Sequence, residues 1–197
     1  MNKSILYIGN DFSKKSKYKA TMETLSSLLK KEGFIIYKSS SKQNKLLRLT
    51  DMCWSVYKFR NQVDYILIDT FSTTNFYFAL ITSQVARVFK IKYIPILHGG
   101  NLPIRLDKSS KLATLIFKNS YKNIAPSNYL KIEFESKGYK TLFIPNVLEI
   151  ENYRFKERNK LEPRLLWVRA FKQLYNPKMA IEVLNLVTKA YPKAKLC

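Results

Sequence analysis

Cysteine and histidine, two residue types that often supply reactive groups or metal ligands, are scarce in this sequence. Cysteine occurs twice, at positions 53 and 197, and histidine once, at position 98. Two cysteines this far apart form no disulfide framework and lack the spacing of metal ligands. The composition therefore argues against a disulfide-stapled secreted domain, leads us to expect no metal, and favours a reducing cytoplasm.

Long hydrophobic runs are also missing. The most apolar stretch, residues 76–89, is interrupted by Thr82, Ser83, Gln84 and Arg87. It therefore falls short of the roughly 20 apolar residues that a membrane-spanning helix needs. The N-terminal residues 1–10 are basic and then apolar, but the apolar part is too short for a signal peptide. We expect neither a transmembrane segment nor a secretion signal.

Acidic residues are few relative to basic ones. The chain has 35 Lys and Arg against 14 Asp and Glu, a formal net charge of +21. Such an excess indicates an anionic partner, which can be nucleic acid, an acidic membrane or a phosphorylated small molecule. The charges are spread along the chain, and no known nucleic-acid-binding motif occurs. Because basic residues between Arg87 and Lys122 flank apolar helices, we expect an anionic membrane surface and no specific nucleic acid.

Hydrophobic residues make up 46% of the 197 residues, which is enough for a packed core. Continuous apolar strands alternate with helical patterns, which is typical of a parallel sheet covered on both faces. Strands are predicted at 5–8, 34–37, 65–69, 93–97, 123–126 and 142–144. Helices are predicted at about 20–31, 44–60, 74–89, 110–119 and 128–137. The fold class is therefore α/β, with a doubly wound, Rossmann-type sheet over residues 1–148.

The rest of the chain has a different pattern. Residues 149–164 are charged and aperiodic, which predicts a linker. Residues 165–197 read as strand, helix and the start of another strand, the first β-α-β piece of a second Rossmann-type domain. Such a piece cannot bury its own apolar faces. We therefore expect that most of this second domain is missing; the alternative is that the piece packs on the first domain as an extra layer.

The only histidine directly follows a predicted strand and precedes two glycines. Because the carboxyl ends of parallel strands share one edge of a sheet, we expect Gly9, Asn10, Asp69, His98 and Gly99 to converge. His98 is then a candidate ligand-facing side chain, although a loop histidine beside a glycine turn is an equal alternative. Asp69 can orient a ligand hydroxyl, but capping of the next helix is favoured for it.

Several motifs, in order along the whole chain, resemble glycosyltransferase family 4, the retaining group 1 enzymes with the GT-B fold. They are Gly9-Asn10, residues 21–26 (TMETLS), residues 98–103 (HGGNLP), residues 125–130 (APSNYL), residues 144–146 (IPN) and residues 166–169 (LWVR). The resemblance implies an N-terminal acceptor-side domain over 1–148 and a donor-binding domain that begins at 165. It implies transfer of a sugar from a nucleotide-sugar to a sugar or lipid-linked acceptor in cell-envelope polysaccharide or glycoconjugate synthesis.

The resemblance also assigns roles to residues. His98 corresponds to a catalytic residue beside the transferred sugar. The nucleotide-sugar diphosphate is expected at Gly9, Asn10 and Gly99, and Arg169 corresponds to the residue that neutralises the leaving diphosphate. No further cofactor and no metal are implied. The enzyme is expected in the cytoplasm, peripheral on the inner face of the membrane.

Three features depart from the family pattern. The loop 12–19 has no glycine, so Lys15, Lys17 and Lys19 are the candidates for phosphate binding there; the alternative is that this part of the site is degraded. Tyr175 stands where members often have a lysine, and the donor-domain glutamate motif would lie beyond Cys197. We therefore expect the 197-residue chain to be inactive alone. The alternatives are a basic, non-enzymatic module that binds acidic membrane or nucleic acid, and a remnant without activity.

Overall fold

The computed structural model describes residues 3–11, 20–157 and 162–197. The chain forms two compact units, residues 1–148 and 149–197. The boundary between them lies where the sequence predicts the linker to begin.

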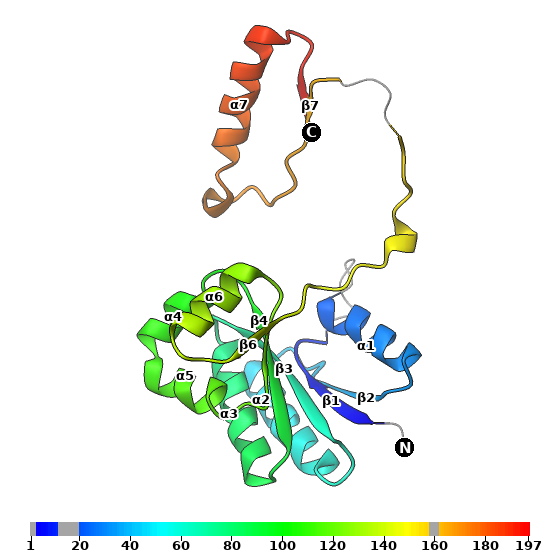
Figure 1. Ribbon diagram of the computed structural model, residues 1–197, viewed down its shortest axis with the longest axis vertical. Coiled ribbons are helices and arrows are strands. Elements are labelled where there is room, and N and C mark those ends of the chain that lie inside the picture. The colour runs from blue at the N-terminus through cyan, green and yellow to red at the C-terminus, as the bar shows by residue number, and fades with distance from the viewer. Residues whose placement is uncertain (1–2, 12–19, 158–161) are drawn as a thin grey trace. The chain divides into compact units, whose positions relative to one another are not determined.

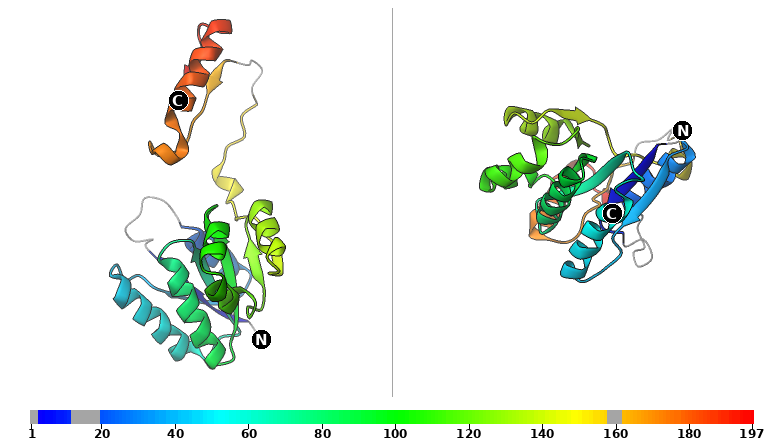
Figure 2. Two further views of the ribbon diagram at one scale, coloured as in Figure 1. Left: turned by 90° about the vertical axis from the view of Figure 1, so that its left-hand side faces the viewer. Right: turned by 90° about the horizontal axis from the view of Figure 1, so that it is seen from below.

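The first unit contains one parallel sheet of six strands (Figure 1 and Figure 2). The strands stand in the order β2-β1-β3-β4-β5-β6, and every neighbouring pair is parallel. They are β1 (Ser4–Ile8), β2 (Ile35–Ser39), β3 (Tyr65–Phe71), β4 (Lys92–His98), β5 (Asn123–Ala125) and β6 (Thr141–Phe143). The predicted α/β class and parallel sheet are confirmed.

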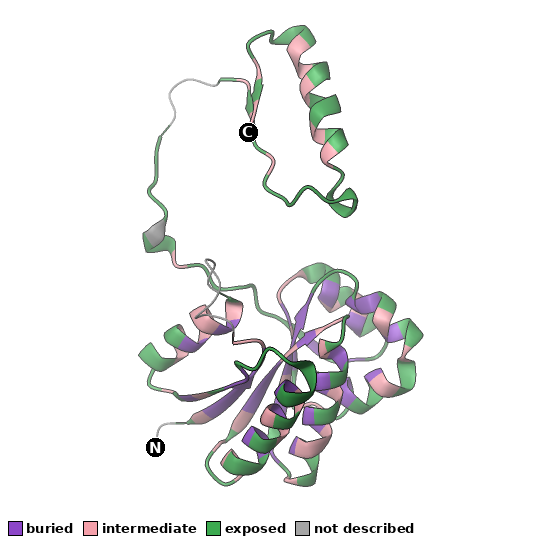
Figure 3. Cartoon of the chain, turned by 180° about the vertical axis from the view of Figure 1, so that it is seen from behind, coloured by how far each residue is buried: buried purple, intermediate pink, exposed green. Residues whose placement is uncertain are grey.

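Helices cover both faces of this sheet. They are α1 (Thr21–Lys31), α2 (Lys45–Phe59), α3 (Asn75–Val88), α4 (Leu102–Lys108), α5 (Ser110–Phe117) and α6 (Asn128–Ser136). Met22 and Leu29 of α1 pack with Ile5 and Tyr7 of β1 in one cluster. The buried residues of α2 to α6 form the second and larger cluster, with Leu6 and Ile8 of the same strand. Alternate side chains of β1 thus enter opposite layers, as a doubly wound sheet requires, and Figure 3 shows the buried residues along the strands.

Helix starts and stops follow the side chains that the sequence supplies. The Asn44 side-chain oxygen accepts hydrogen bonds from the backbone N–H groups of Leu46 and Leu47 at the start of α2. Ser127 caps α6 in the same way by accepting from Leu130. After α1 the chain turns at Gly33, whose φ of +86° favours glycine. These boundaries agree with the sequence prediction to within a few residues.

Helix α4 was not predicted. Its segment follows Gly99-Gly100 and contains Pro103, and both features are typical of a loop. Proline is nevertheless well tolerated in a first helical turn, where its missing N–H has no partner within the helix, and Pro103 stands there. The predicted strand 34–37 is also shifted, since β2 begins at Ile35 and continues to Ser39.

The second unit is a small β-α-β arrangement. Strands β7 (Arg164–Leu165) and β8 (Lys195–Leu196) pair in parallel, and between them lie the short helix η2 (Gln173–Tyr175) and α7 (Pro177–Ala190); η1 (Ile150–Asn152) precedes them. The strand expected from residue 165 onward is therefore only two residues long and begins one residue earlier, at Arg164. No residue described in this unit is fully buried. The apolar side chains Leu166, Ile181 and Leu186 are exposed, as expected for a piece that cannot bury its own faces.

Candidate functional site

The candidate site lies where the strand order reverses. After β1 the chain moves to β2 at one side, and from β3 onward it proceeds to the other side of β1. Doubly wound proteins bind ligands outside the carboxyl ends of their strands at such a switch point. Here the ends of β1 and β3 bring Gly9 and Asp69 together, and the adjacent β4 adds His98.

Gly9 is in close contact with the Asp69 carboxylate. A Cβ built on Gly9 would lie 2.5 Å from Asp69 Oδ2 and 3.2 Å from Met22 Sδ of α1. No real Cβ approaches an oxygen so closely, so a larger residue here would displace the carboxylate. Glycine at this position is explained by packing, because Asp69 occupies the space that a side chain would need.

Asp69 binds two side chains through one oxygen. The Tyr7 hydroxyl donates to Asp69 Oδ1 over 2.9 Å, and His98 Nε2 lies 2.9 Å from the same oxygen. The Asp69 and His98 side chains are only 9% and 10% exposed. A carboxylate that is largely removed from water needs such donors to offset its lost hydration. Burial of the Tyr7 phenol, together with the neighbouring Asp69 charge, raises the pKa of Tyr7 far above its ordinary value.

The imidazole of His98 is held from two directions. Phe71 stacks on it with 4.7 Å between ring centroids and an interplanar angle of 18°. Asp69 holds its Nε2, and within the described ranges Nδ1 has no hydrogen-bond partner. An imidazole whose Nε2 donates to a carboxylate keeps its unprotonated Nδ1 as an acceptor. The chain then turns at Gly99, which has a φ of +86°, and the Leu102 N–H donates to Gly99 O at the start of α4.

Asn10 faces a different partner. Its side-chain oxygen accepts a hydrogen bond of 3.0 Å from Arg48 Nη1, and the same guanidinium donates to the backbone oxygens of Lys42 and Gln43. Arg48 is buried, and this burial lowers the pKa of its guanidinium. The arrangement fixes the segment after β1 against the start of α2.

The hollow at the switch point is small. It is lined by Gly9, Asn10 and Asp69 together with residues of α2 and α3, and it measures about 10 Å³. This is at the lower limit for one water molecule. The hollow is therefore too small to hold a sugar or a phosphate.

The predicted convergence of Gly9, Asp69 and His98 is confirmed by these contacts, and Asn10 and Gly99 follow the same strand ends. The favoured capping role of Asp69 is wrong. Strand β3 continues to Phe71, so Asp69 lies inside the strand and binds Tyr7 and His98, and α3 starts only at Asn75.

Other candidates lie elsewhere. Lys15, Lys17 and Lys19 fall outside the described residues. Arg169 belongs to the second unit, where its guanidinium lies 5.3 Å from the Tyr175 ring. Asp11, the residue after Asn10, forms an ion pair of 3.1 Å with Lys38.

Two residues of the site escaped the sequence reasoning. Tyr7 stands inside an apolar strand, and its only signal is that a buried phenol needs a hydrogen-bond partner. Arg48 was missed because an arginine on an amphipathic helix usually lies at the surface.

Three further findings concern metal ligands, membrane-spanning helices and similarity to known proteins. Among the described residues, no three His, Cys, Asp or Glu side chains come together as metal ligands. No helix in that part of the chain is both long enough and apolar enough to cross a membrane. No protein-family model matches this chain, and no curated protein matches it.

Proposed function

We propose that this chain belongs to a glycosyltransferase of the family 4 type, which moves a sugar from a nucleotide-sugar to a sugar or lipid-linked acceptor. The observation that carries the proposal is the Asp69–His98 pair, held at the carboxyl edge of a doubly wound sheet beside its switch point. In this proposal residues 1–148 bind the acceptor, and residues 165–197 belong to a donor-binding domain.

His98 is the proposed catalytic residue. Asp69 and Phe71 hold its ring, and Nδ1 is the ring nitrogen that remains to bind a hydroxyl of the transferred sugar. A hydrogen bond that is already oriented stabilises charge in the transition state without further reorganisation. Asp69 and Tyr7 are positioning residues in this scheme, because they contact the imidazole or its partner and not the sugar.

The donor diphosphate is proposed to lie over the carboxyl edge of the sheet, beside the N-terminus of α1. This helix end comes close to Gly9, as the position of Met22 shows, and its N-cap residue is Ala20, which has no side chain able to cap it. The first-turn N–H groups of such a helix favour an anion. By resemblance, Arg169 neutralises the leaving diphosphate from the donor domain, so that the reaction needs no metal.

The test is a transfer assay on this chain extended by a complete donor-binding domain, with a panel of nucleotide-sugars. We expect nucleoside diphosphate release with at least one donor. His98→Ala should lower turnover about 100-fold while acceptor affinity changes far less. Lys111→Ala, on the exposed side of α5, serves as the control and should leave turnover unchanged. No release with any donor, or full turnover in His98→Ala, would contradict the proposal.

The alternative is a non-enzymatic module that binds an acidic surface. The observation in its favour is a group of exposed cations at the other end of the sheet, which does not involve His98. The two functions are separable, because loss of the imidazole should affect only sugar transfer. Cytoplasmic placement at the inner face of a membrane remains part of the proposal.

A further inference from the structure

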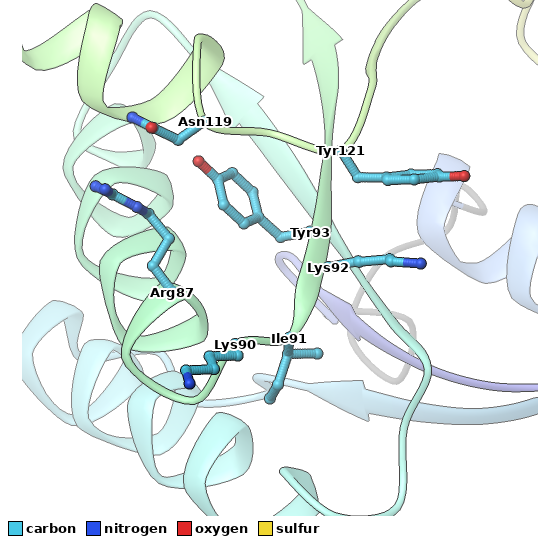
Figure 4. A pocket seen from close by; sticks show the side chains of 7 residues that line it. All are labelled: Arg87, Lys90, Ile91, Lys92, Tyr93, Asn119 and Tyr121. Carbon is cyan, nitrogen blue, oxygen red and sulfur yellow. The ribbon is translucent and has the colours of Figure 1, made fainter.

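The amino-terminal end of the sheet, opposite the candidate site, carries a band of cations and aromatic rings. Two neighbouring hollows of about 360 and 230 Å³ open there, and they share Lys90, Ile91 and Lys92. Figure 4 shows the larger one, in which Arg87 and Asn119 lie near the Tyr93 ring on one side of β4, while Lys92 and Tyr121 project to the other side. We define the basic-aromatic rim as a set of six residues from the ends of α2 and α3. It consists of the exposed Trp54, Tyr57, Arg87, Val88 and Lys90 and of the half-buried Arg60.

Ring contacts make the rim continuous between the ends of α2 and α3. Trp54 contacts Tyr57 with 5.4 Å between ring centroids, and Tyr57 contacts Phe89 with 5.8 Å. The Arg60 guanidinium lies over both rings, 4.1 Å from the Tyr57 centroid and 5.8 Å from that of Phe89. The C-terminal ends of two neighbouring helices therefore present a single surface.

The charge of this region is almost entirely positive. The residues that line the two hollows include four basic ones, Arg60, Arg87, Lys90 and Lys92, and one acidic one, Asp64. Asp64, which lines the smaller hollow, accepts a hydrogen bond of 2.7 Å from the Ser4 backbone N–H. The rim is thus complementary to an extended anionic surface.

Exposed apolar groups stand among these cations. Val88 is 75% exposed and Trp54 is 60% exposed, on neighbouring helices. Aliphatic and indole groups surrounded by Lys and Arg are typical of proteins that lie at a lipid headgroup layer, where the long basic side chains reach phosphates. This pattern favours a bilayer over a fully aqueous partner.

The ring faces argue against single-stranded nucleic acid. Base stacking needs open aromatic faces. Here Arg60 covers Tyr57, and Lys92 lies 5.1 Å from the centroid of Tyr121 and 5.8 Å from that of Tyr65. Cations thus lie over three of the rings on which bases could otherwise stack, Tyr57, Tyr65 and Tyr121.

We propose that the basic-aromatic rim binds the anionic headgroup surface of a lipid bilayer, with Val88 and Trp54 entering the interface. This binding uses none of the site residues, so it stands or falls independently of the proposed sugar transfer. Each Lys or Arg close to an anionic membrane adds to the attraction, and salt weakens it.

The test is vesicle flotation with phosphatidylglycerol-containing and pure phosphatidylcholine vesicles. The rim variant is Arg87→Glu with Lys90→Glu. The matched control is Lys45→Glu with Lys111→Glu, which makes the same change in net charge. Both control residues are exposed, and they lie in the first turns of α2 and α5, at the helix ends away from the rim. We expect wild type and control to bind the anionic vesicles within about twofold of each other, and the rim variant at least tenfold more weakly.

A second readout follows the rim directly. In a Trp167→Phe background Trp54 is the only tryptophan, and its fluorescence should shift to the blue on anionic vesicles and stay unchanged on neutral ones. Equal weakening in both double variants, no shift of Trp54, or no preference for anionic vesicles would overturn the proposal. So would a single-stranded oligonucleotide that binds more tightly than the vesicles and displaces them, because the rim would then be a nucleic-acid surface.

Discussion

The two ends of the six-stranded sheet differ in how far their polar groups are buried and paired. At the carboxyl end, Asp69 and His98 are largely buried and bind each other, with Tyr7 as a third member. At the amino end, Arg87 and Lys90 are exposed beside apolar groups. One end is therefore a small, preorganised cluster, and the other is a surface whose charge a partner can neutralise.

A single strand connects the two ends. Strand β4 begins at Lys92, in the hollows beside the rim, and finishes at His98, so that six residue steps of roughly 3.3 Å separate them by about 20 Å. Over this distance, through a packed sheet, substitutions at one end should be nearly additive with those at the other. A substitution at one end that changes the stability or the binding properties of the other end would contradict this independence.

The largest effect is expected from Gly9→Ala. Its new Cβ would overlap Asp69 Oδ2, so the carboxylate must shift and weaken its bonds to Tyr7 and His98. We expect the free energy of unfolding in urea to fall by about 2–4 kcal/mol. Gly100→Ala is the matched control, because a Cβ there meets nothing within 4 Å, and its change should stay within about 0.5 kcal/mol. Equal stability of the two variants would contradict the close packing at Gly9.

A smaller effect is expected from Tyr7→Phe, which removes one donor to the buried carboxylate. At neutral pH it should lower the free energy of unfolding by about 1–2 kcal/mol. The exposed Tyr191→Phe, which lies in the second unit, should cost less than about 0.5 kcal/mol.

The pH dependence sharpens this prediction. Burial raises the pKa of Tyr7, and it raises the pKa of Tyr93 to about 12. The unfolded state therefore releases these protons first, from about pH 10, so the stability of the wild type is retained below that pH and lost above it. Each group contributes a slope of roughly 1.4 kcal/mol per pH unit. Urea unfolding above about pH 10 should show a shallower decline in Tyr7→Phe; identical slopes would place the Tyr7 hydroxyl in water.

Much of this arrangement could be predicted from the sequence, because it depends on strand ends. The apolar runs predict parallel strands, and the residues that follow them must meet at one edge, which brings Gly9, Asp69 and His98 together. The register could not be predicted. Two further residues of β3 place Asp69 within the strand and remove it from any capping role.

The remaining misses also have physical causes. Helix α4 was not predicted because Gly99-Gly100 and Pro103 have low helix propensity and are typical of a loop. The role of Tyr7 depends on a contact with Asp69, 62 residues away in the sequence. Local patterns contain no information about such long-range partners.

The Asp69–His98 pair is the centre of the proposed site. Because His98 is the only histidine, the imidazole signals in an NMR spectrum of the chain belong to it. We predict that ¹⁵N NMR of the imidazole at about pH 9 shows one neutral tautomer, protonated at Nε2. Asp69→Ala should allow both tautomers, whereas Arg87→Glu with Lys90→Glu should leave the spectrum unchanged. A wild-type imidazole that is protonated at Nδ1, or that averages between tautomers, would contradict the site at the carboxyl end of the sheet.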